Sequence, residues 1–130
     1  LGTARVIAGG LAGAKGPAHT FTPMQVVDLK LHGTKREEIA VPEGWTTVVV
    51  VLRGSLRVDG SEPVEEAEVG LFDRPGRGIV IDEASEARAL LLSGEPTHEP
   101  IVGMGPFVMN SPGEIRQAMI DFESGRMGRL

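Results

Sequence analysis

The segment 45–60, WTTVVVVLRGSLRVDG, decides the fold class of this chain. Its first half, 45–52, is rich in Val and Thr and becomes apolar on both faces, which is typical of a strand in the middle of a sheet. Gly54 interrupts this pattern, and apolar and charged residues then alternate up to Asp59. The pair Asp59-Gly60 is typical of a tight turn. The segment therefore predicts β-structure built around a buried central strand.

Short apolar stretches recur on both sides of this segment, at intervals of about ten residues. The stretch 25–32 alternates most clearly, because Val27, Leu29 and Leu31 share one face while polar residues occupy the other. We predict further strands at 5–8, 37–41, 68–72, 78–81 and 87–92. The 18 Gly and 9 Pro residues supply turns, and the glycine-rich stretch 9–17 is predicted to be a surface loop. This order predicts an all-β barrel or sandwich.

One helix is predicted near the C-terminal end of the sequence, over residues 112–123. Ser111 is the expected N-cap, Pro112 occupies the first helical position, and Glu114 completes a capping box. Gly125 is the expected stop. The apolar stripe of the helix consists of Ile115, Ala118, Met119 and Phe122. We expect this stripe to cover an open end of the barrel or to dock on a neighbouring domain.

Length and composition limit the function classes. The 130 residues suit one domain, 1–130, and no boundary is evident within it. The formal net charge of −5 argues against direct nucleic-acid binding. No apolar run approaches the ~20 residues that span a bilayer. The absence of Cys excludes disulfides and thiolate sites and is compatible with the cytoplasm. The sequence shows no signal-peptide pattern. Its first residue is Leu rather than Met, so we expect an excised fragment or a trimmed chain.

The sequence offers little catalytic or metal-binding chemistry. The histidines, His19, His32 and His98, lie far apart, and we interpret them as loop, strand-end and turn residues without a carboxylate partner. The carboxylates cluster near turns or on outward faces, where they are expected to be solvated. No Gly-x-Ser-x-Gly motif is present, and the stretch 9–16 departs from the phosphate-binding loop pattern. We therefore assign no catalytic residue and no metal ligand.

A ligand pocket inside the barrel is the remaining possibility for a binding site. A small barrel can enclose an apolar ligand, and Trp45, Val49 and Ile79 are the candidate lining residues. The alternative is that Trp45, the only Trp, belongs to the core or to the barrel rim. Both interpretations stay open at the level of the sequence.

A longer motif near the end of the chain is more specific. Residues 94–110 read GEPTHEPIVGMGPFVMN, and EIRQA follows at 114–118. This pattern resembles the C-terminal signature of the pirin family, in which a Gly-x-Pro-x-x-Glu-Pro segment leads to Gly-Pro-Phe-Val-Met-Asn and a short helix. The segments 17–23, 42–45 and 51–54 resemble pirins as well. The resemblance covers nearly the whole chain, but only the second half of a pirin.

The resemblance implies an all-β cupin-type barrel (a double-stranded β-helix, or jelly roll) with one short C-terminal α-helix. Pirins are similar to bicupins, with iron held by three His and a Glu in the N-terminal barrel. Some members are associated with quercetin 2,3-dioxygenase activity, and others with a transcription cofactor role. The corresponding ligand positions here are largely apolar, with Glu43 the only potential ligand in 41–47 and apolar residues in 78–81. We therefore expect no cofactor in this chain.

The resemblance also names structural and interface positions. The structural signature consists of Gly94, Pro96, Glu99, Pro100, Gly105 and Pro106. We expect the Glu99 carboxylate to bind backbone amides and Asn110 to bind backbone as well. Phe107 and Met109 are apolar at alternate positions, and we expect them to pack against the helix or against a second barrel. The candidate interface with a second barrel consists of Phe107, Met109, Asn110, Ile115, Met119 and Phe122.

These observations favour a non-catalytic, metal-free cupin domain with a structural or interaction role beside a catalytic or partner domain. A homodimer or a second cupin domain is the expected partner, because a barrel without its usual neighbour exposes an apolar face. One alternative is a part of an iron-dependent quercetin 2,3-dioxygenase-like enzyme whose metal lies outside this chain. Another alternative is a barrel that binds a small apolar ligand.

Overall fold

The computed structural model describes residues 2–128 and divides into two compact units, 1–96 and 97–130. Unit 1 contains eight of the strands, and unit 2 contains the remaining two strands and the helix. The sequence indicated no domain boundary inside 1–130, and no sequence pattern marked the division between the two units after residue 96. Whether the units fold separately is a question of stability, so the prediction of a single domain stays a prediction.

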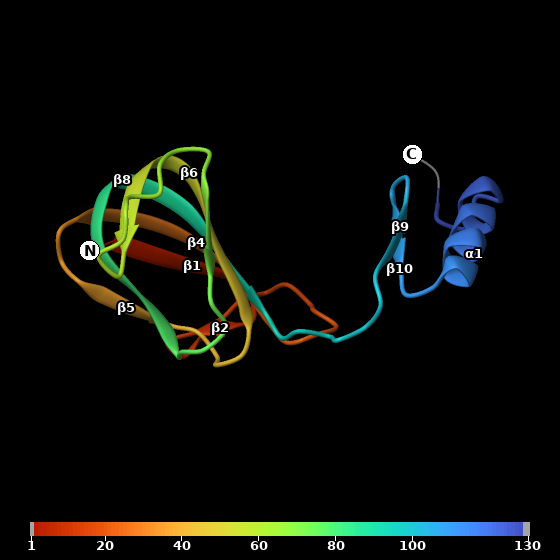
Figure 1. The fold of residues 1–130 in the computed structure, drawn as a ribbon, viewed down its shortest axis with the longest axis horizontal. Coiled ribbons are helices and arrows are strands. Elements are labelled where there is room, and N and C mark those ends of the chain that lie inside the picture. The colour runs from red at the N-terminus through yellow and green to blue at the C-terminus, as the bar shows by residue number, and fades with distance from the viewer. Residues whose placement is uncertain (1, 129–130) are drawn as a thin grey trace. The chain divides into compact units, whose positions relative to one another are not determined.

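Unit 1 is built on one antiparallel sheet that bends around a core. Its strands are β1 (Gly2–Ala8), β4 (Met24–Gly33), β5 (Glu37–Ala40), β6 (Thr46–Val58), β7 (Val69–Phe72) and β8 (Gly78–Gly94). The order along the sheet is β1-β4-β8-β6-β7, and β5 pairs with the first residues of β8. Figure 1 shows β8 curving from its start beside β5 to the part that lies beside β4 and β6.

Two of the predicted strands, 78–81 and 87–92, are parts of the single strand β8. β6 likewise continues through Gly54, where the sequence suggested a break. The pairing of β6 with β8 shifts register around Arg53, and Gly54 has a φ of +69° and Glu86 a φ of +44°. These irregularities are bulges, which bend a strand without ending it. The prediction of two separate strands over 78–92 was therefore wrong.

The glycine-rich stretch 9–17 is not a plain loop. It contains a small hairpin of β2 (Gly10–Leu11) and β3 (Ala14–Lys15). The hairpin turns through Ala12 and Gly13, which have φ angles of +48° and +82°. The other strands predicted in unit 1 are present, with ends that differ from the prediction by a few residues. The largest difference is at 5–8, because β1 begins at Gly2.

The core of unit 1 follows from the alternation along the strands. Val27, Leu29 and Leu31 of β4 point to one side and are buried, as predicted. The buried cluster is completed by Ile39, Val49, Val51, Leu56, Val58, Ile79, Ile81, Ala84, Ala87, Ala89 and Leu91. β4, β6 and β8 therefore turn alternate residues into the barrel, and β5 contributes Ile39. The all-β prediction is confirmed.

Unit 2 consists of a hairpin and a helix. β9 (Val102–Met104) pairs with β10 (Phe107–Met109), and α1 (Pro112–Glu123) packs against both strands. The predicted helix, 112–123, is confirmed. Ser111 caps it by accepting a hydrogen bond from the backbone N–H of Glu114, and Gly125 follows the helix with a φ of +76°. Within the described residues, no helix has the length and apolar composition to cross a membrane.

Candidate functional site

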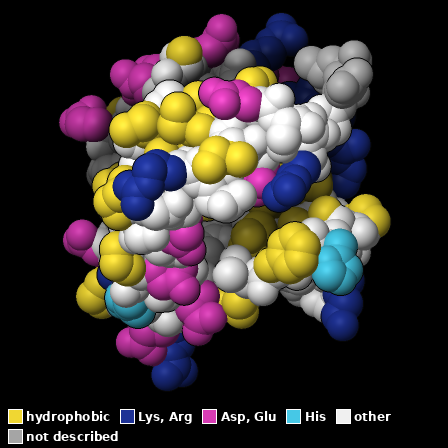
Figure 2. Space-filling view, turned by 90° about the vertical axis from the view of Figure 1, so that its right-hand side faces the viewer, with side chains coloured by type: hydrophobic (Ala, Val, Ile, Leu, Met, Phe, Trp, Pro, Cys, Tyr) yellow, Lys and Arg dark blue, Asp and Glu magenta, His cyan; other side chains and the backbone are white. Residues whose placement is uncertain are grey.

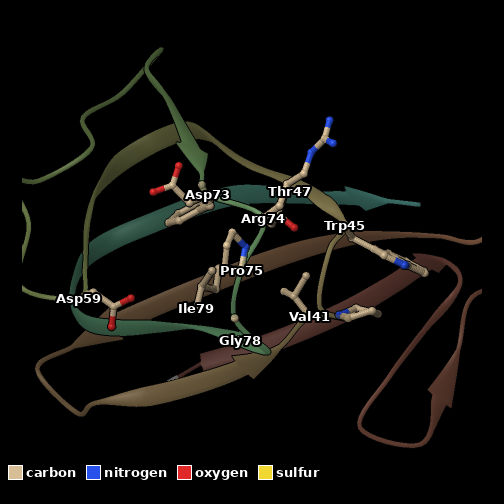
Figure 3. Close-up of a pocket in the computed structure, with 12 residues that line it drawn as sticks. Val41, Trp45, Thr47, Asp59, Asp73, Arg74, Pro75, Gly78 and Ile79 are labelled. Atoms are coloured by element: carbon tan, nitrogen blue, oxygen red, sulfur yellow. The ribbon is translucent and has the colours of Figure 1, made fainter. Parts of the chain in front are cut away.

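A pocket of about 240 Å³ opens at one end of the barrel in unit 1. Trp45 and Ile79 line it, as do Val41, Thr47 and Phe72 (Figure 3). The Trp45 indole and the Asp59 carboxylate lie at opposite ends of the view. Other charged lining residues are Asp73 and Arg74.

The structure brings together two of the three candidate pocket residues. Trp45 and Ile79 line the same pocket, whereas Val49 has an exposed fraction of 0% and belongs to the core cluster. Val49 is the next inward-pointing residue of β6 after Thr47, and at this depth the barrel interior is filled by core side chains. The pocket is therefore confined to the barrel end.

A row of buried polar side chains crosses the barrel near this end. Gln25 of β4 pairs in register with Ser93 of β8, and Ser93 pairs with Thr47 of β6. The three residues are 8%, 5% and 3% exposed. The hydroxyls of Thr47 and Ser93 lie 2.8 Å apart, and the Gln25 side chain donates to the carbonyl of Gly10 at 2.7 Å. The Gln25 Oε1 atom has no hydrogen-bond partner among the described residues.

Sequence reasoning missed this row, which we call the polar row. Two of its members occupy inward positions of predicted strands, since Gln25 alternates with Val27, and Thr47 alternates with Val49. Ser93 lies one residue beyond the predicted strand 87–92. The alternation was therefore an available signal for Gln25 and Thr47. The neighbourhood of the three residues depends on strand pairing, which no local pattern reveals.

The opposite, outward face of the same sheet is apolar across several strands. One row in register consists of Val26, Leu92, Val48 and Leu71. The next consists of Asp28, Leu90, Val50 and Val69. Leu71 and Val69 of β7 are 72% and 58% exposed, and the other apolar members are half-buried. We call these apolar residues the outward face.

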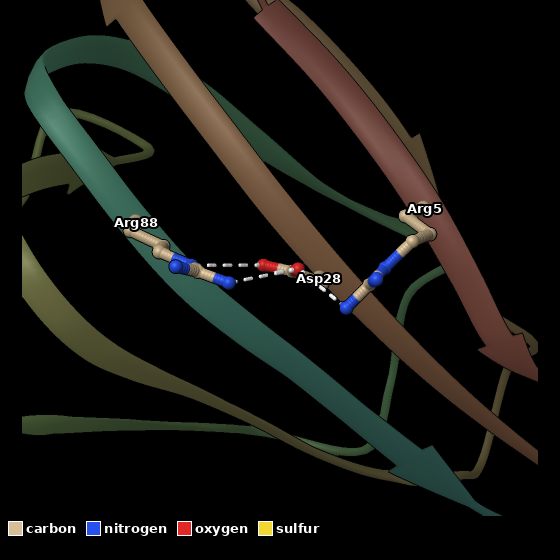
Figure 4. Close-up of polar contacts among 3 residues, drawn as sticks. All are labelled: Arg5, Asp28 and Arg88. Carbon is tan, nitrogen blue, oxygen red and sulfur yellow. Dashed lines mark hydrogen bonds and ion pairs between the residues drawn. The ribbon is translucent and has the colours of Figure 1, made fainter.

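Cations border the outward face. Asp28 is 5% exposed and lies between two arginines (Figure 4). Arg5 donates to its carboxylate at 3.1 Å, and Arg88 donates to it at 3.3 and 3.4 Å. Arg88 is also paired in register with Lys30 on one side and Arg53 on the other. Like charges in register repel, so the single carboxylate compensates only part of this positive charge.

The candidate interface residues all lie in unit 2, where they have different environments. Ile115 is buried at 2% exposure, and Phe107 meets Phe122 edge to face with ring centroids 6.0 Å apart. Met109 is half-buried in β10, while Met119 and Phe122 are 38% and 64% exposed. In the space-filling view of Figure 2, hydrophobic side chains reach the surface beside acidic ones. Part of the predicted set is thus internal packing, and part is open surface.

The signature residues shape the entry to unit 2. Asn110 donates to the carbonyl of Pro100 at 2.8 Å, as predicted, and also to the Glu99 carboxylate at 3.2 Å. The bond that the structure gives Glu99 is thus with a side-chain amide, not with the expected backbone amide. Gly105 has a φ of +55° and forms the β9–β10 turn with Pro106. Gly94 ends β8, and Pro96 ends unit 1.

The fold and its sequence match a known family. The family model described as "Pirin C-terminal cupin domain" matches residues 26–128, which is most of the chain. The chain belongs to the pirin C-terminal cupin domain family. The resemblance seen in the motif 94–110 is thereby confirmed, and so is the cupin-type barrel.

The curated relatives of this cupin domain include proteins named as quercetin 2,3-dioxygenases and proteins named pirin. A Pseudomonas aeruginosa protein named "Putative quercetin 2,3-dioxygenase PA2418" is 48% identical over 128 residues, which cover 98% of this chain and 44% of the relative. Human pirin is 30% identical over 131 residues, which cover 97% of this chain and 45% of the relative. The chain spans less than half of the length of these relatives.

Among solved structures, a quercetin 2,3-dioxygenase from Acinetobacter baumannii superimposes with a TM-score of 0.90 at 42% identity. The match covers 98% of this chain and 44% of that chain. A second structure of the same name and organism, at 22% identity and a TM-score of 0.83, shares the fold.

The residues of this pirin-type domain do not fit the iron that the resemblance implies for the family. The buried groups at the barrel end are neutral, and the lining of the pocket adds the carboxylates of Asp59 and Asp73 but no imidazole. Non-haem iron takes imidazole and carboxylate ligands together. Glu43 is exposed and meets Arg77 at 3.2 Å. His19, His32 and His98 are all exposed. Within residues 2–128, no three His, Asp or Glu side chains are grouped as a metal site.

Proposed function

We propose that this chain is a non-catalytic, metal-free cupin domain that serves as a docking module for a second barrel. The outward face carries the proposal. A strand with one side in the core and one side in water alternates apolar and polar residues. β6 and β8 depart from this rule, because Val48, Val50, Leu90 and Leu92 are apolar and point away from the core. Such a face is typical of a surface that is covered in the working assembly.

The partner that we propose for this chain is a second copy of it, docked through the outward face in a homodimer. Closed two-fold pairs are the commonest assemblies of a single chain, and they place the same patch on both subunits. In a longer protein, a neighbouring cupin domain would occupy the same face.

Light scattering coupled to gel filtration tests this proposal. We expect the wild-type chain to be a dimer and the variant Val69→Lys/Leu71→Lys to be a monomer with an unchanged circular dichroism spectrum. The control is Phe21→Lys, which changes a side chain that is 99% exposed and lies outside the outward face. A wild-type chain that stays monomeric at high concentration, or a double variant that still dimerises, would contradict the proposal.

A second function is supported by the comparisons to a similar degree. The chain would be part of an iron-dependent quercetin 2,3-dioxygenase-like enzyme, because a relative with that name is 48% identical. Its metal would then lie on a segment outside this chain. A quercetin turnover assay on an iron-loaded N-terminal cupin domain of the family, with and without this chain, separates the two functions. We expect the chain to leave turnover unchanged, and turnover that requires the chain would favour the enzyme. We further propose a cytoplasmic location, in keeping with the absence of Cys.

A further inference from the structure

We infer that a second pocket of the barrel binds a small molecule with an apolar body of about one ring and a protonated amine. This pocket has a volume of about 250 Å³ and is lined by β1, the β2–β3 hairpin, β4, β5 and β8. It shares no lining residue with the pocket of Trp45 and Ile79. None of its lining residues belongs to the outward face, so this role differs from docking.

The pocket opens at a seam in the barrel wall between β1 and β5. β5 pairs with β8 along one edge, and no described strand pairs with its other edge. On the β1 side of the seam, Ala4 is in register with Leu29 and therefore lies on the same, inward side of the sheet. A side chain as small as that of Ala4 leaves the space beside Leu29 unfilled. The pocket is reached from solvent here, since Ala4 and Glu37 are both exposed.

The floor of the pocket is apolar. Its four large aliphatic residues belong to the core cluster, and Leu11 of the hairpin packs against the same cluster. A cavity of roughly 150 Å³ with such a lining is enough to hold benzene. A pocket of about 250 Å³ therefore accommodates one ring with a short substituent. The floor residues are Leu29, Leu31, Ile39 and Ile81.

The only charged residues that line the pocket are acidic. They are Glu37 and Glu38, and neither forms an ion pair among the described residues. Glu37 is in register with Ile81 and shares the inward side of β5 with Ile39. Its carboxylate thus borders the apolar floor, at a position where alternation along β5 continues the core. A ligand whose body lies on this floor can donate a hydrogen bond from a protonated amine to Glu37.

A different explanation for Glu37 is protection of the sheet edge. Charged residues that point inward on an edge strand discourage pairing with other chains. This explanation predicts that removal of the charge promotes association and changes no ligand preference. Binding in the pocket predicts instead that removal of the charge abolishes a preference for cationic ligands.

The test compares two probes of nearly the same shape, phenethylamine and 2-phenylethanol. The amine is protonated at neutral pH, like that of lysine, whereas the alcohol is neutral. Titrations of the whole 130-residue chain at low salt are followed by amide chemical shifts in NMR. We expect saturable shifts around residues 4, 31 and 39 with both probes. The affinity for phenethylamine should be about three- to fivefold higher, as for an ion pair with an exposed carboxylate, and salt should reduce this difference.

Two variants, each with a matched control, separate the floor from the charge. Ala4→Ile fills the pocket and should abolish the saturable shifts with both probes, whereas Ala18→Ile changes an exposed alanine outside the pocket and should bind like the wild type. Glu37→Gln should still bind 2-phenylethanol but lose the preference for phenethylamine. Glu66→Gln removes the same charge from an exposed residue outside the pocket and should keep the preference.

The inference is overturned if neither probe causes saturable shifts at the pocket, or if the wild type binds both probes equally. It is also overturned if Ala4→Ile, shown by circular dichroism to be folded, still binds them, or if Glu37→Gln keeps the preference. Glu37 is exposed, so its variant gives a result even if Ala4→Ile folds poorly. The monomeric variant Val69→Lys/Leu71→Lys should bind phenethylamine like the wild type, so the docking and ligand proposals fail separately.

Discussion

At the scale of single residues, backbone angles identify positions where the sequence is strained. Ala67 lies in the loop between β6 and β7 with a φ of +66°, a left-handed conformation that suits Gly. Its N–H still donates to the carbonyl of Val51 at 2.9 Å, so pairing with β6 holds the angle. The strain is retained because the surrounding strand pairing outweighs it.

The substitution Ala67→Gly should therefore raise the free energy of unfolding by about 1 kcal/mol, because Gly adopts this angle without a steric penalty. Chemical denaturation measures the change. The comparison is Ala40→Gly in β5, where Gly weakens a strand and should lower the free energy of unfolding by roughly 0.5–1 kcal/mol. Equal effects of both substitutions would show that the angle at Ala67 does not matter.

Asp28 is a charged residue whose side chain is buried. Its carboxylate is almost fully buried, while its partners Arg5 and Arg88 have side chains that are 73% and 51% exposed. Asp28→Asn keeps the shape of the side chain and removes its charge, which weakens the hydrogen bonds from Arg5 and Arg88. We expect the free energy of unfolding to fall by only about 1–2 kcal/mol, because both arginines are exposed and water solvates them after the substitution. Thermal and urea unfolding measure the loss. Glu66→Gln, an exposed carboxylate in the β6–β7 loop, should change it by less than about 0.5 kcal/mol.

At the scale of elements, the bend in β6 and β8 makes the barrel possible. Both strands run past irregularities around Gly54 and Glu86, which lets β8 pair with β5 at its start and with β4 further on. Gly54 has no room for a side chain, because a Cβ would lie 2.2 Å from the carbonyl oxygen of Ser85. The close approach of the two strands at this point therefore depends on Gly.

Gly54→Ala should lower the free energy of unfolding by more than about 2 kcal/mol, through both the clash and the positive φ. The control is Gly33→Ala at the end of β4, where φ is +90° but no described atom lies within 4 Å of the added Cβ. It should cost only about 1 kcal/mol, from the angle alone. Chemical denaturation of both variants gives the difference, and a tolerated Gly54→Ala would show that the strands can separate at the bulge.

At the scale of the whole molecule, the two units differ in how much they bury. All members of the core cluster lie between Val27 and Leu91 in unit 1. Among the described residues of unit 2, the buried apolar ones are Ile115 and Ala118, whereas Ile101, Val108 and Phe122 are 84%, 66% and 64% exposed. Chains below about 40 residues seldom fold without additional support, so residues 97–130 form a weak folding unit.

A chain that ends at Pro96 should keep the β-type circular dichroism spectrum and the melting temperature of the 130-residue chain within a few degrees, because it retains the core cluster. A peptide of residues 97–130 should show little helix at room temperature, despite its capped α1. A large loss of stability on truncation, or a cooperative transition in the peptide, would contradict this division of stability.

The sequence by itself determined the local features of this protein. The helix 112–123 was predicted with its cap at Ser111 and its stop at Gly125, because capping involves only neighbouring residues. The inward face of β4 followed from alternation alone. The motif 94–110 was sufficient to indicate the family.

The tertiary structure decided everything that depends on pairing between distant strands. Where both sides of a strand are apolar, as in 48–52, alternation cannot tell the inside from the outside, so the outward face became visible only in the register of β4, β8, β6 and β7. The continuity of β8 through its bulge and the meeting of Gln25, Ser93 and Thr47 have the same origin. Local pattern determines which side chains alternate, but only the three-dimensional register determines which of them meet.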